Sequence, residues 1–475
     1  MRDSRFTARR LCAVVAIAGV GSLAACDQDN LLTVPTPDVV LPGNLTGASV
    51  LPNAYAAALG DFQVAYAGSG GNVVGTFGST EGLVIMSGML SDELLNAETF
   101  PTRLEVDRRA TNPVNATMLP IFHLAQRARA SAELVAASYA QYDPANANRA
   151  EVLALGGYMY ILFAESYCNG VPQSRVNADG SFTYGDPQTG TQLLTNAIAK
   201  FDSAITIATA AGASGATALN LARIGKGRAL LDLNNPTAAA AAVAAVPSTY
   251  VYNIQHNENT TRQYNGVYTF TVTSKRFTVA EKEGINGLPF VTTNDPRVPV
   301  VRTTNGFDGT TPFYRTPKYT SLAQAPARGA PTPLALGTEA RLIEAEAALR
   351  AGDAVTFLAR LNDARVNAKT YTDSPIPPPA MSPLLVTDVP PDAVGRENLL
   401  FRERAFDLYL TSHRLGDLRR LIRQYGRGAE TVFPTGVYNP LGAAAGNSYG
   451  PDVNLPIPFE ETNNPQYKAC LDRVA

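Results

Sequence analysis

The chain has 475 residues and a formal net charge of −2 at pH 7, with only 17% charged residues. It contains no basic block of the kind that binds nucleic acid, which excludes that class of partner. Beyond the first 25 residues, no apolar run reaches the ~20 residues that a membrane-spanning helix needs. The length exceeds one ordinary hydrophobic core, yet no linker divides the chain clearly.

The first 25 residues have the features of a secretory signal peptide. Four arginines, at positions 2, 5, 9 and 10, precede the apolar run 11–20, which is too short to span a bilayer. The run leads to Leu23-Ala24-Ala25-Cys26, which resembles the bacterial lipobox. We therefore expect cleavage before Cys26 and acylation of its thiol, with enough buried methylene groups for stable anchoring. The alternative is an ordinary signal peptide followed by a chance cysteine.

Residues 26–47 are predicted to form a tether. Acidic and amide residues follow Cys26, and three prolines interrupt regular structure, at Pro35, Pro37 and Pro42. Because residues 1–25 hold four Arg and one Asp, the chain without them carries a formal net charge of −5. We expect this segment to hold the folded body, residues 48–475, away from the membrane surface.

Helical patterns dominate the next 200 residues. Apolar residues recur every three or four positions in 48–66, 120–140, 191–208, 219–233 and 236–245. Asn148-Arg149-Ala150-Glu151 resembles a capping box and predicts the start of a further apolar helix that reaches about Tyr167. Consecutive helices with short joints favour antiparallel pairs of the tetratricopeptide type.

The character of the sequence changes after residue 246. Aromatic residues in 247–337 are scattered among Asn, Thr, Gly and Pro, which predicts an irregular, loop-rich lobe. Within it, the alternation of residues 268–272 (Tyr-Thr-Phe-Thr-Val) predicts one short strand.

Helical periodicity returns after this lobe, at 338–351, 354–368 and 392–424. The remaining residues, 426–475, are predicted to be largely extended. The predicted fold is therefore mainly α. Antiparallel helix pairs in 48–246 and 338–425 form a scaffold, and the lobe carries a few short strands.

Signal removal and lipidation leave two cysteines, Cys168 and Cys470. In an oxidising compartment two thiols allow a single intramolecular pairing, which would tie the C-terminal segment to the helical body. The alternative is two unrelated thiols, because the sequence alone does not bring the two within bonding distance.

The sequence offers little for catalysis or metal binding. The three histidines are far apart and lack metal-ligand spacing: His123, His256 and His413. Residues 446–450 match G-x-S-x-G, but without the strand before and the helix after that a nucleophile elbow needs. Gly225-Lys226-Gly227 lacks the rest of a phosphate loop and lies inside a predicted helix. We predict a protein that is not an enzyme, with no catalytic residue, metal or cofactor.

The sharpest motif runs from Glu403-Arg404 through His413-Arg414 to Asp417-Leu418-Arg419-Arg420. It resembles the ER-x-x-EL-x-x-EG-x-R-x-x-DL-x-R pattern of the SusD/RagB family of outer-membrane nutrient-binding lipoproteins. Further family-like motifs occur in the family's order, at 158–172, 295–297, 318–319, 344–347 with 362–365, and 455–465. The departures are Asp407 for Glu, Thr411-Ser412 for Glu-Gly, and Leu415 for an aromatic residue.

These motif residues are predicted to be structural. On helices, side chains three or four positions apart meet, so carboxylates and guanidinium groups can hold neighbouring helices together. We assign this role to Glu403, Arg404, Arg414 and Asp417, without ligand contact.

The resemblance implies a lipid-anchored, surface-exposed subunit of the cell outer membrane. Such a protein captures a nutrient oligosaccharide, or in some relatives a peptide, and passes it to a SusC-like TonB-dependent transporter. The predicted ligand loops are 68–100 and 250–319, and the predicted ligand contacts are Tyr66, Phe77, Asp92, Tyr314 and Tyr319. Two alternatives stay open: a surface-anchored helical scaffold that binds protein alone, and a hydrolase with an unrecognised site.

Overall fold

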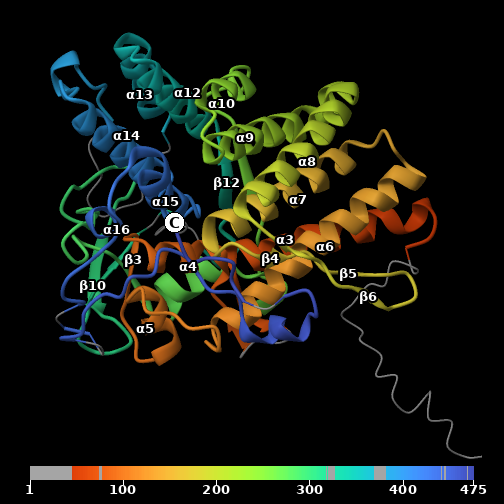
Figure 1. Ribbon diagram of the computed structural model, residues 1–475, viewed down its shortest axis with the longest axis horizontal. Helices are drawn as coiled ribbons and strands as arrows, with labels where there is room; N and C mark the ends of the chain where they lie inside the picture. The colour runs from red at the N-terminus through yellow and green to blue at the C-terminus, as the bar shows by residue number, and fades with distance from the viewer. Residues whose placement is uncertain are drawn as a thin grey trace, which may run out of the picture. The chain divides into compact units, whose positions relative to one another are not determined.

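Long, alanine-rich helices build the first half of the protein, shown as a computed structural model in Figure 1. The structure describes residues 45–73, 78–316, 318, 327–368, 381–439, 441–442, 445–467 and 469–475. The helices are α3 (Leu51–Ala67), α6 (Met118–Tyr142), α7 (Ala147–Ser166), α8 (Gly190–Ala210), α9 (Ala216–Asp232) and α10 (Pro236–Val243). Each overlaps a segment that periodicity predicts to be helical, so those predictions are confirmed.

Polar side chains determine where these helices begin. Thr189 and Gln192 form a capping box at the start of α8, in which the Thr189 N–H donates to Gln192 Oε1 at 2.8 Å. At α7 the cap is Asn146, whose side-chain oxygen accepts from the Asn148 N–H at 2.9 Å. The prediction that Asn148 opens this helix is therefore wrong by two residues, because the backbone of Asn148 is already helical.

Successive helices pack side by side: α3 on α6, α6 on α7, α7 on α8, α8 on α9, and α9 on α10. The row continues from α10 to α12 (Gly337–Ala351) and then to α13 (Ala354–Asn367), although the irregular lobe separates α10 from α12 in sequence. Stacked helix pairs of this kind bury a continuous apolar layer between neighbours. The mainly α fold with tetratricopeptide-like pairs is confirmed.

The lobe contributes short antiparallel strands that pair two by two. The pairs important for the site are β3 (Leu94–Asn96) with β9 (Phe277–Val279), and β10 (Val301–Asn305) with β11 (Pro312–Arg315). Another pair joins the beginning and the end of the lobe, because β8 (Val251–Ile254) pairs with β12 (Thr332–Leu336). The remaining pairs are β1 (Ser69–Val73) with β2 (Gly78–Thr80), β4 (Val171–Pro172) with β7 (Pro187–Gln188), and β5 (Arg175–Val176) with β6 (Phe182–Thr183).

The strand predicted at 268–272 is wrong. These residues lie in a one-turn helix, α11 (Gly266–Tyr268), and a π-helical turn, Thr269–Thr273. The Asn265 side chain accepts from the Tyr268 N–H at 3.0 Å and starts the turn. The hydroxyls of Thr269 and Thr271 then donate to carbonyls four residues back, so the threonines support helical turns instead of a strand.

The segment 68–100, predicted as a ligand loop, is largely buried. It contains α4 (Gly82–Leu90), all of whose residues are buried, and then β3. The helix is apolar on every side, so it has no amphipathic period to reveal it. It is followed by α5 (Pro101–Asp107), which begins at a proline suited to a first helical turn.

The C-terminal third consists of α14 (Ala393–Asp407), α15 (Arg414–Tyr425), a short α16 (Ala429–Val432) and a long extended tail. The tail returns to the end of α7, where the Leu455 N–H donates to the Ser166 carbonyl at 2.8 Å. Residues 42–475 form one compact unit by their contacts. The domain boundary predicted at residue 48 stays a prediction.

Candidate ligand-binding surface

Two of the three histidines are buried side chains in hydrogen bonds. His256 Nε2 lies 3.0 Å from Thr332 Oγ1, and His413 Nε2 lies 2.9 Å from Glu339 Oε1. His123 lies on α6, in another part of the fold. Across the described ranges, no three His, Cys, Asp or Glu side chains converge as metal ligands would. His256 and His413 are therefore each held in a buried hydrogen bond.

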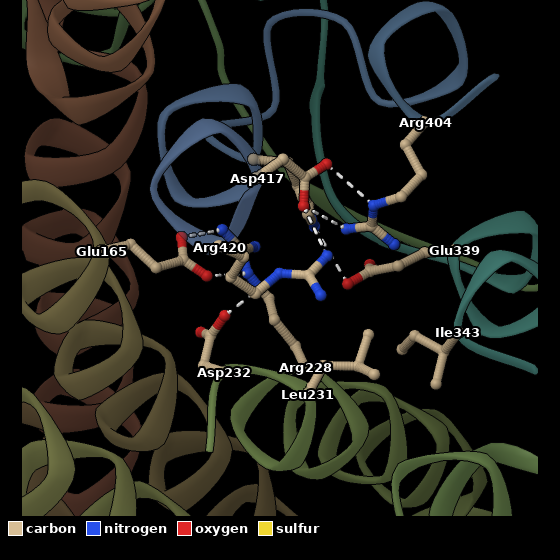
Figure 2. Close-up of a pocket in the computed structure, with 10 residues that line it drawn as sticks. Glu165, Arg228, Leu231, Asp232, Glu339, Ile343, Arg404, Asp417 and Arg420 are labelled. Atoms are coloured by element: carbon tan, nitrogen blue, oxygen red, sulfur yellow. Dashed lines mark hydrogen bonds and ion pairs between the residues drawn. The ribbon is translucent and has the colours of Figure 1, made fainter. Parts of the chain in front are cut away.

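One enclosed cavity lies where α7, α9, α12, α14 and α15 meet (Figure 2). The centre of a water molecule can move through only ≈ 10 Å³ of it, which is room for about one water. An oligosaccharide cannot enter such a space. Charged side chains dominate its wall, which consists of Glu165, Arg228, Leu231, Asp232, Glu339, Ile343, Arg404, His413, Asp417 and Arg420.

These charges form an ion-pair network that joins the helices. Arg228 on α9 donates to both carboxylate oxygens of Glu165 on α7, at 2.7 and 2.5 Å. Arg404 on α14 and Arg420 on α15 both donate to Asp417. Burial opposes ionisation of Asp417, but the two guanidinium groups together hold its pKa below the ordinary value. The network is a structural element of the helix packing.

The other motif residues lie in similar contacts. Glu403 accepts from Arg297 at 2.8 Å and from Arg365 at 2.8 Å, so it ties the lobe to α13 and α14. Arg414 donates to both oxygens of Asp92, at 2.6 and 2.9 Å. The four residues predicted to be structural, Glu403, Arg404, Arg414 and Asp417, are thus all buried in ion pairs.

Two of the five predicted ligand contacts have no surface to offer a ligand. Tyr66 is fully buried, and its hydroxyl is 2.8 Å from the Pro333 carbonyl and 3.0 Å from the Thr411 carbonyl. Asp92 is fully buried against Arg414. We withdraw both from the candidate ligand residues. Phe77 and Tyr319 lie outside the described residues.

Tyr314 on β11 keeps part of its surface accessible. Arg302 is its cross-strand partner on β10, and the guanidinium carbon of Arg302 lies 5.6 Å from the centre of the tyrosine ring. Of the predicted contacts that the structure describes, Tyr314 is therefore the one that can still reach a ligand.

Two phenylalanines that the sequence analysis did not single out are exposed beside each other. Phe100 at the start of α5 is 49% exposed, and Phe307 in the turn between β10 and β11 is 54% exposed. The guanidinium carbon of Arg276 lies 5.3 Å from the Phe100 ring centre and 4.4 Å from the Phe307 ring centre. One cation thus holds two aromatic rings at the protein surface.

Strand pairing creates this arrangement. The β3–β9 register sets Asn96 opposite Phe277, and the Ala97 N–H donates to the Arg276 carbonyl at 2.8 Å. Arg276 consequently lies next to the segment that leads into Phe100. In Figure 1, β3, α5 and β10 lie in the same region of the molecule.

The tip of the β10–β11 hairpin packs closely on the same segment. The Asp308 N–H donates to the Ala97 carbonyl at 2.9 Å, and the Phe307 N–H donates to the Lys275 carbonyl at 3.0 Å. A side chain at Gly306 would bring its Cβ within 2.4 Å of the Ala97 Cβ. Glycine at 306 therefore allows the close approach that brings Phe307 beside Arg276.

Buried carboxylates fix the cations behind the rings. Glu98 is fully buried and pairs with both Arg276 and Arg103. Arg103 pairs in addition with Glu81, and its guanidinium carbon lies 5.0 Å from the Phe100 ring centre. The rings are therefore supported by a rigid, internally neutralised set of side chains, which is the preorganisation that a binding surface requires.

Both phenylalanines fall inside the predicted ligand loops 68–100 and 250–319. Phe307 stands in Asn305-Gly306-Phe307-Asp308-Gly309, where turn residues flank a large apolar side chain. An aromatic residue at such a turn is a local signal for exposure. Nothing in the sequence alone pairs it with Phe100 or with Arg276.

The C-terminal tail is attached near the end of α7 by a disulfide between Cys168 and Cys470, whose Cα atoms lie 5.9 Å apart. Asn169 donates to the Asp472 carboxylate at 2.8 Å beside it. Oxidation of the pair in solution stays a prediction.

Within the described ranges, every helix is too short or too polar to cross a membrane.

Comparison with known proteins rests on structure alone, because no family model and no curated protein matches the sequence. A SusD superfamily protein from Bacteroides fragilis has a TM-score of 0.61 at 16% identity, over 88% of this chain and 99% of its own. One from Bacteroides vulgatus has a TM-score of 0.60 at 14% identity, over 90% and 99%.

A third similar structure is surface glycan-binding protein A from Bacteroides thetaiotaomicron in complex with laminarihexaose. Its TM-score is 0.60 at 13% identity, over 90% of this chain and 100% of its own. At such low identity these likenesses establish the fold and leave the ligand open.

Proposed function

We propose that this chain, which has the fold of the SusD superfamily, is a non-catalytic glycan-binding protein of an outer-membrane nutrient-uptake system. The observation that carries the proposal is the exposed pair Phe100 and Phe307, held by Arg276. The opposed faces of sugar rings carry C–H groups that stack on aromatic rings, and polar side chains at the rim orient the hydroxyls.

The remaining features support binding over catalysis. The enclosed cavity is water-sized, and its charged groups are paired with one another between helices. Exposed aromatic side chains on a supported surface suit an extended ligand that lies across the protein. One structure of the same fold was solved with laminarihexaose, a glucan oligosaccharide, which agrees with this use of the fold.

The membrane part of the proposal rests on the sequence. The lipobox-like Leu23-Ala24-Ala25-Cys26 would provide a lipid anchor, and Cys26 lies outside the described residues. We propose that the anchored protein passes its ligand to a SusC-like TonB-dependent transporter. Because the lipid would be attached through the Cys26 thiol, the unmodified protein should incorporate radiolabelled palmitate and Cys26→Ser should not. Labelling of C26S would contradict an anchor at Cys26.

A binding panel tests the ligand class. The purified chain should retain at least one class of oligosaccharide, and Phe100→Ala and Phe307→Ala should each weaken that binding by about tenfold, because each removes a stacking platform. Phe182→Ala is the matched control, since Phe182 is 62% exposed on the separate β5–β6 hairpin. It should leave the affinity unchanged.

Other outcomes would redirect the proposal. Retention of peptides with no glycan bound would favour a peptide-binding member of the same uptake system. Equal loss of binding in all three phenylalanine variants would indicate nonspecific adsorption. Co-purification of the native protein with a TonB-dependent transporter would support the proposed transfer of the ligand to such a transporter. Recovery with soluble partners alone would contradict that transfer.

A further inference from the structure

The surface beside the two phenylalanines is lined with cations whose charge is not balanced. Lys275 Nζ lies 2.8 Å from the Thr304 hydroxyl, and Arg302 donates to the Thr304 carbonyl at 2.6 Å and to Asn305 Oδ1 at 3.0 Å. These acceptors are all neutral. Within the residues that the structure describes, neither Lys275 nor Arg302 has a carboxylate partner.

Arg276 provides the contrast. It lies one residue from Lys275, yet its charge is met by the buried Glu98. The lobe therefore compensates the cation that supports the phenylalanine rings and leaves two neighbouring cations uncompensated. The chain as a whole is net negative, so this positive strip is a local feature.

Cations and aromatic rings lie next to one another on this surface. Arg302 stacks on Tyr314 across the hairpin, and Lys275 contacts Thr304, two residues further along β10 from Arg302. The Lys275 carbonyl accepts from Phe307, whose ring lies against Arg276, which in turn lies against Phe100. We call this set the strip; its members are Phe100, Lys275, Arg276, Arg302, Phe307 and Tyr314.

The hairpin itself carries a single carboxylate, Asp308 in the turn. It accepts from the N–H groups of Thr310 and Thr311, both at 2.9 Å, and from the Thr311 hydroxyl at 2.6 Å. These bonds hold Asp308 inside the turn. It makes no ion pair with Lys275 or Arg302 among the described residues, so the strip presents its positive charge to a ligand.

We infer that the strip binds an anionic oligosaccharide, one whose sugar rings carry carboxylate or sulfate groups. This inference rests on the proposed glycan-binding function and specifies the ligand class. A uronate residue offers both an apolar C–H face for an aromatic ring and a carboxylate for a neighbouring cation. Charge-assisted hydrogen bonds from Lys275 and Arg302 would then select acidic over neutral sugars.

The test compares ligands that differ only in charge. Isothermal titration calorimetry with the purified chain would use oligogalacturonate, the same oligomer fully methyl-esterified, a sulfated galactan oligosaccharide and a neutral galactan oligosaccharide. We expect oligogalacturonate to bind at least tenfold more tightly than its methyl ester, with an affinity that falls as NaCl is raised from 50 to 500 mM. Binding of the sulfated oligomer alone would support the anionic class, with sulfate as its source.

Two variants connect the effect to the strip. Lys275→Gln and Arg302→Gln should each lower the affinity for the acidic ligand severalfold and remove much of its salt dependence. Lys282→Gln is the matched control, because Lys282 is an exposed lysine of the same lobe outside the strip. Thermal unfolding midpoints of all three variants would show that the fold is intact.

The outcomes separate this inference from the proposed function. If the methyl ester and the neutral galactan bind as tightly as the acidic oligomer, the anionic class is wrong and glycan binding stands. If Lys275→Gln and Arg302→Gln bind the acidic ligand like the unmodified chain, the strip is not its site. If none of these glycans nor any other in the wider panel binds, both proposals fail.

Discussion

Arg404 on α14 donates to both carboxylate oxygens of Asp417 on α15, from Nε at 2.8 Å and from Nη2 at 2.9 Å. Arg420 donates to the same carboxylate at 2.8 Å, and both arginines are buried. Asp417 thus bridges two guanidinium groups between helices. Its removal would leave Arg404 without a carboxylate partner among the described residues, whereas Arg420 would keep its ion pair with Glu346.

We expect Asp417→Asn to lower the free energy of unfolding by about 3–5 kcal/mol, the usual cost of leaving a buried charge unpaired. Chemical denaturation monitored by circular dichroism would measure it. Asp202→Asn is the control, since Asp202 pairs with Lys226 on the surface and its side chain is 52% exposed. That change should cost below about 1 kcal/mol. Similar losses in the two variants would contradict the structural role assigned to the motif.

Helices α7, α8 and α9 approach each other through glycine. An alanine Cβ at Gly225 would lie 2.3 Å from the nearest carbon of the Phe201 ring, whereas one at Gly156 would lie 3.6 Å from Ala132 Cβ. We expect Gly225→Ala to destabilise the protein by about 1–3 kcal/mol through overpacking.

The same substitution at Gly156 should have the opposite sign. It fits the available space and improves helix propensity, so a gain of about 0.5–1 kcal/mol is expected. Thermal or urea unfolding of the two variants gives the comparison directly. A gain of stability in Gly225→Ala would mean that the Phe201 ring can move aside, and would refute tight packing at this point.

The Cys168–Cys470 bridge is expected to form in an oxidising compartment. Intact mass of the unreduced protein should be two hydrogens below that of the reduced form, with no thiol accessible to alkylation in denaturant. Cys470→Ser should lower stability by about 2–4 kcal/mol, because the bridge closes a long loop in the unfolded chain. Two alkylatable thiols in the unreduced mature protein would end this prediction.

Asp107 and Glu283 form a buried pair of carboxyl groups. Tyr438 donates to Asp107, Tyr449 donates to Glu283 at 2.7 Å, and the two tyrosine rings lie 5.2 Å apart. Burial raises the pKa of Asp107 to about 7. Burial, together with the charge of Asp107, raises the pKa of Glu283 well above its ordinary value.

Because the folded protein binds these protons more tightly than the unfolded chain, the pair stabilises the fold at low pH. That stability is fully present below about pH 4 and is lost as the pH rises through about 7 and beyond. The Gln side chain in Glu283→Gln cannot ionise, so this variant should not lose that stability. The unfolding free energy of the variant minus that of the unmodified chain should therefore increase by roughly 1 kcal/mol or more between pH 5 and pH 8. Glu460→Gln, at an exposed site, should show no such change. A pH-independent difference for Glu283→Gln would contradict the raised pKa of Glu283.

The sequence predicted what depends on neighbours along the chain. Helix periodicity and caps are local, and helices such as α6 and α8 were therefore found within a few residues of their bounds. The apolar α4 was missed because burial on all sides removes the period. The turn at 268–272 was misread because threonine hydroxyls can support either a strand or a helical turn.

Phe100 and Phe307 fall inside the two predicted ligand segments, but the sequence did not identify these two residues. Tyr66 and Asp92 have suitable chemistry, and only their burial in the folded core removes them. Phe100, Arg276 and Phe307 come together because β3 pairs with β9 and the hairpin turn rests on Ala97, contacts between segments far apart in the chain. Exposure, distance and charge balance are properties of such contacts, so tertiary structure alone decided which aromatic residues meet which cations. The sequence by itself determined the helical scaffold and the lipobox-like start, since both are written in consecutive residues.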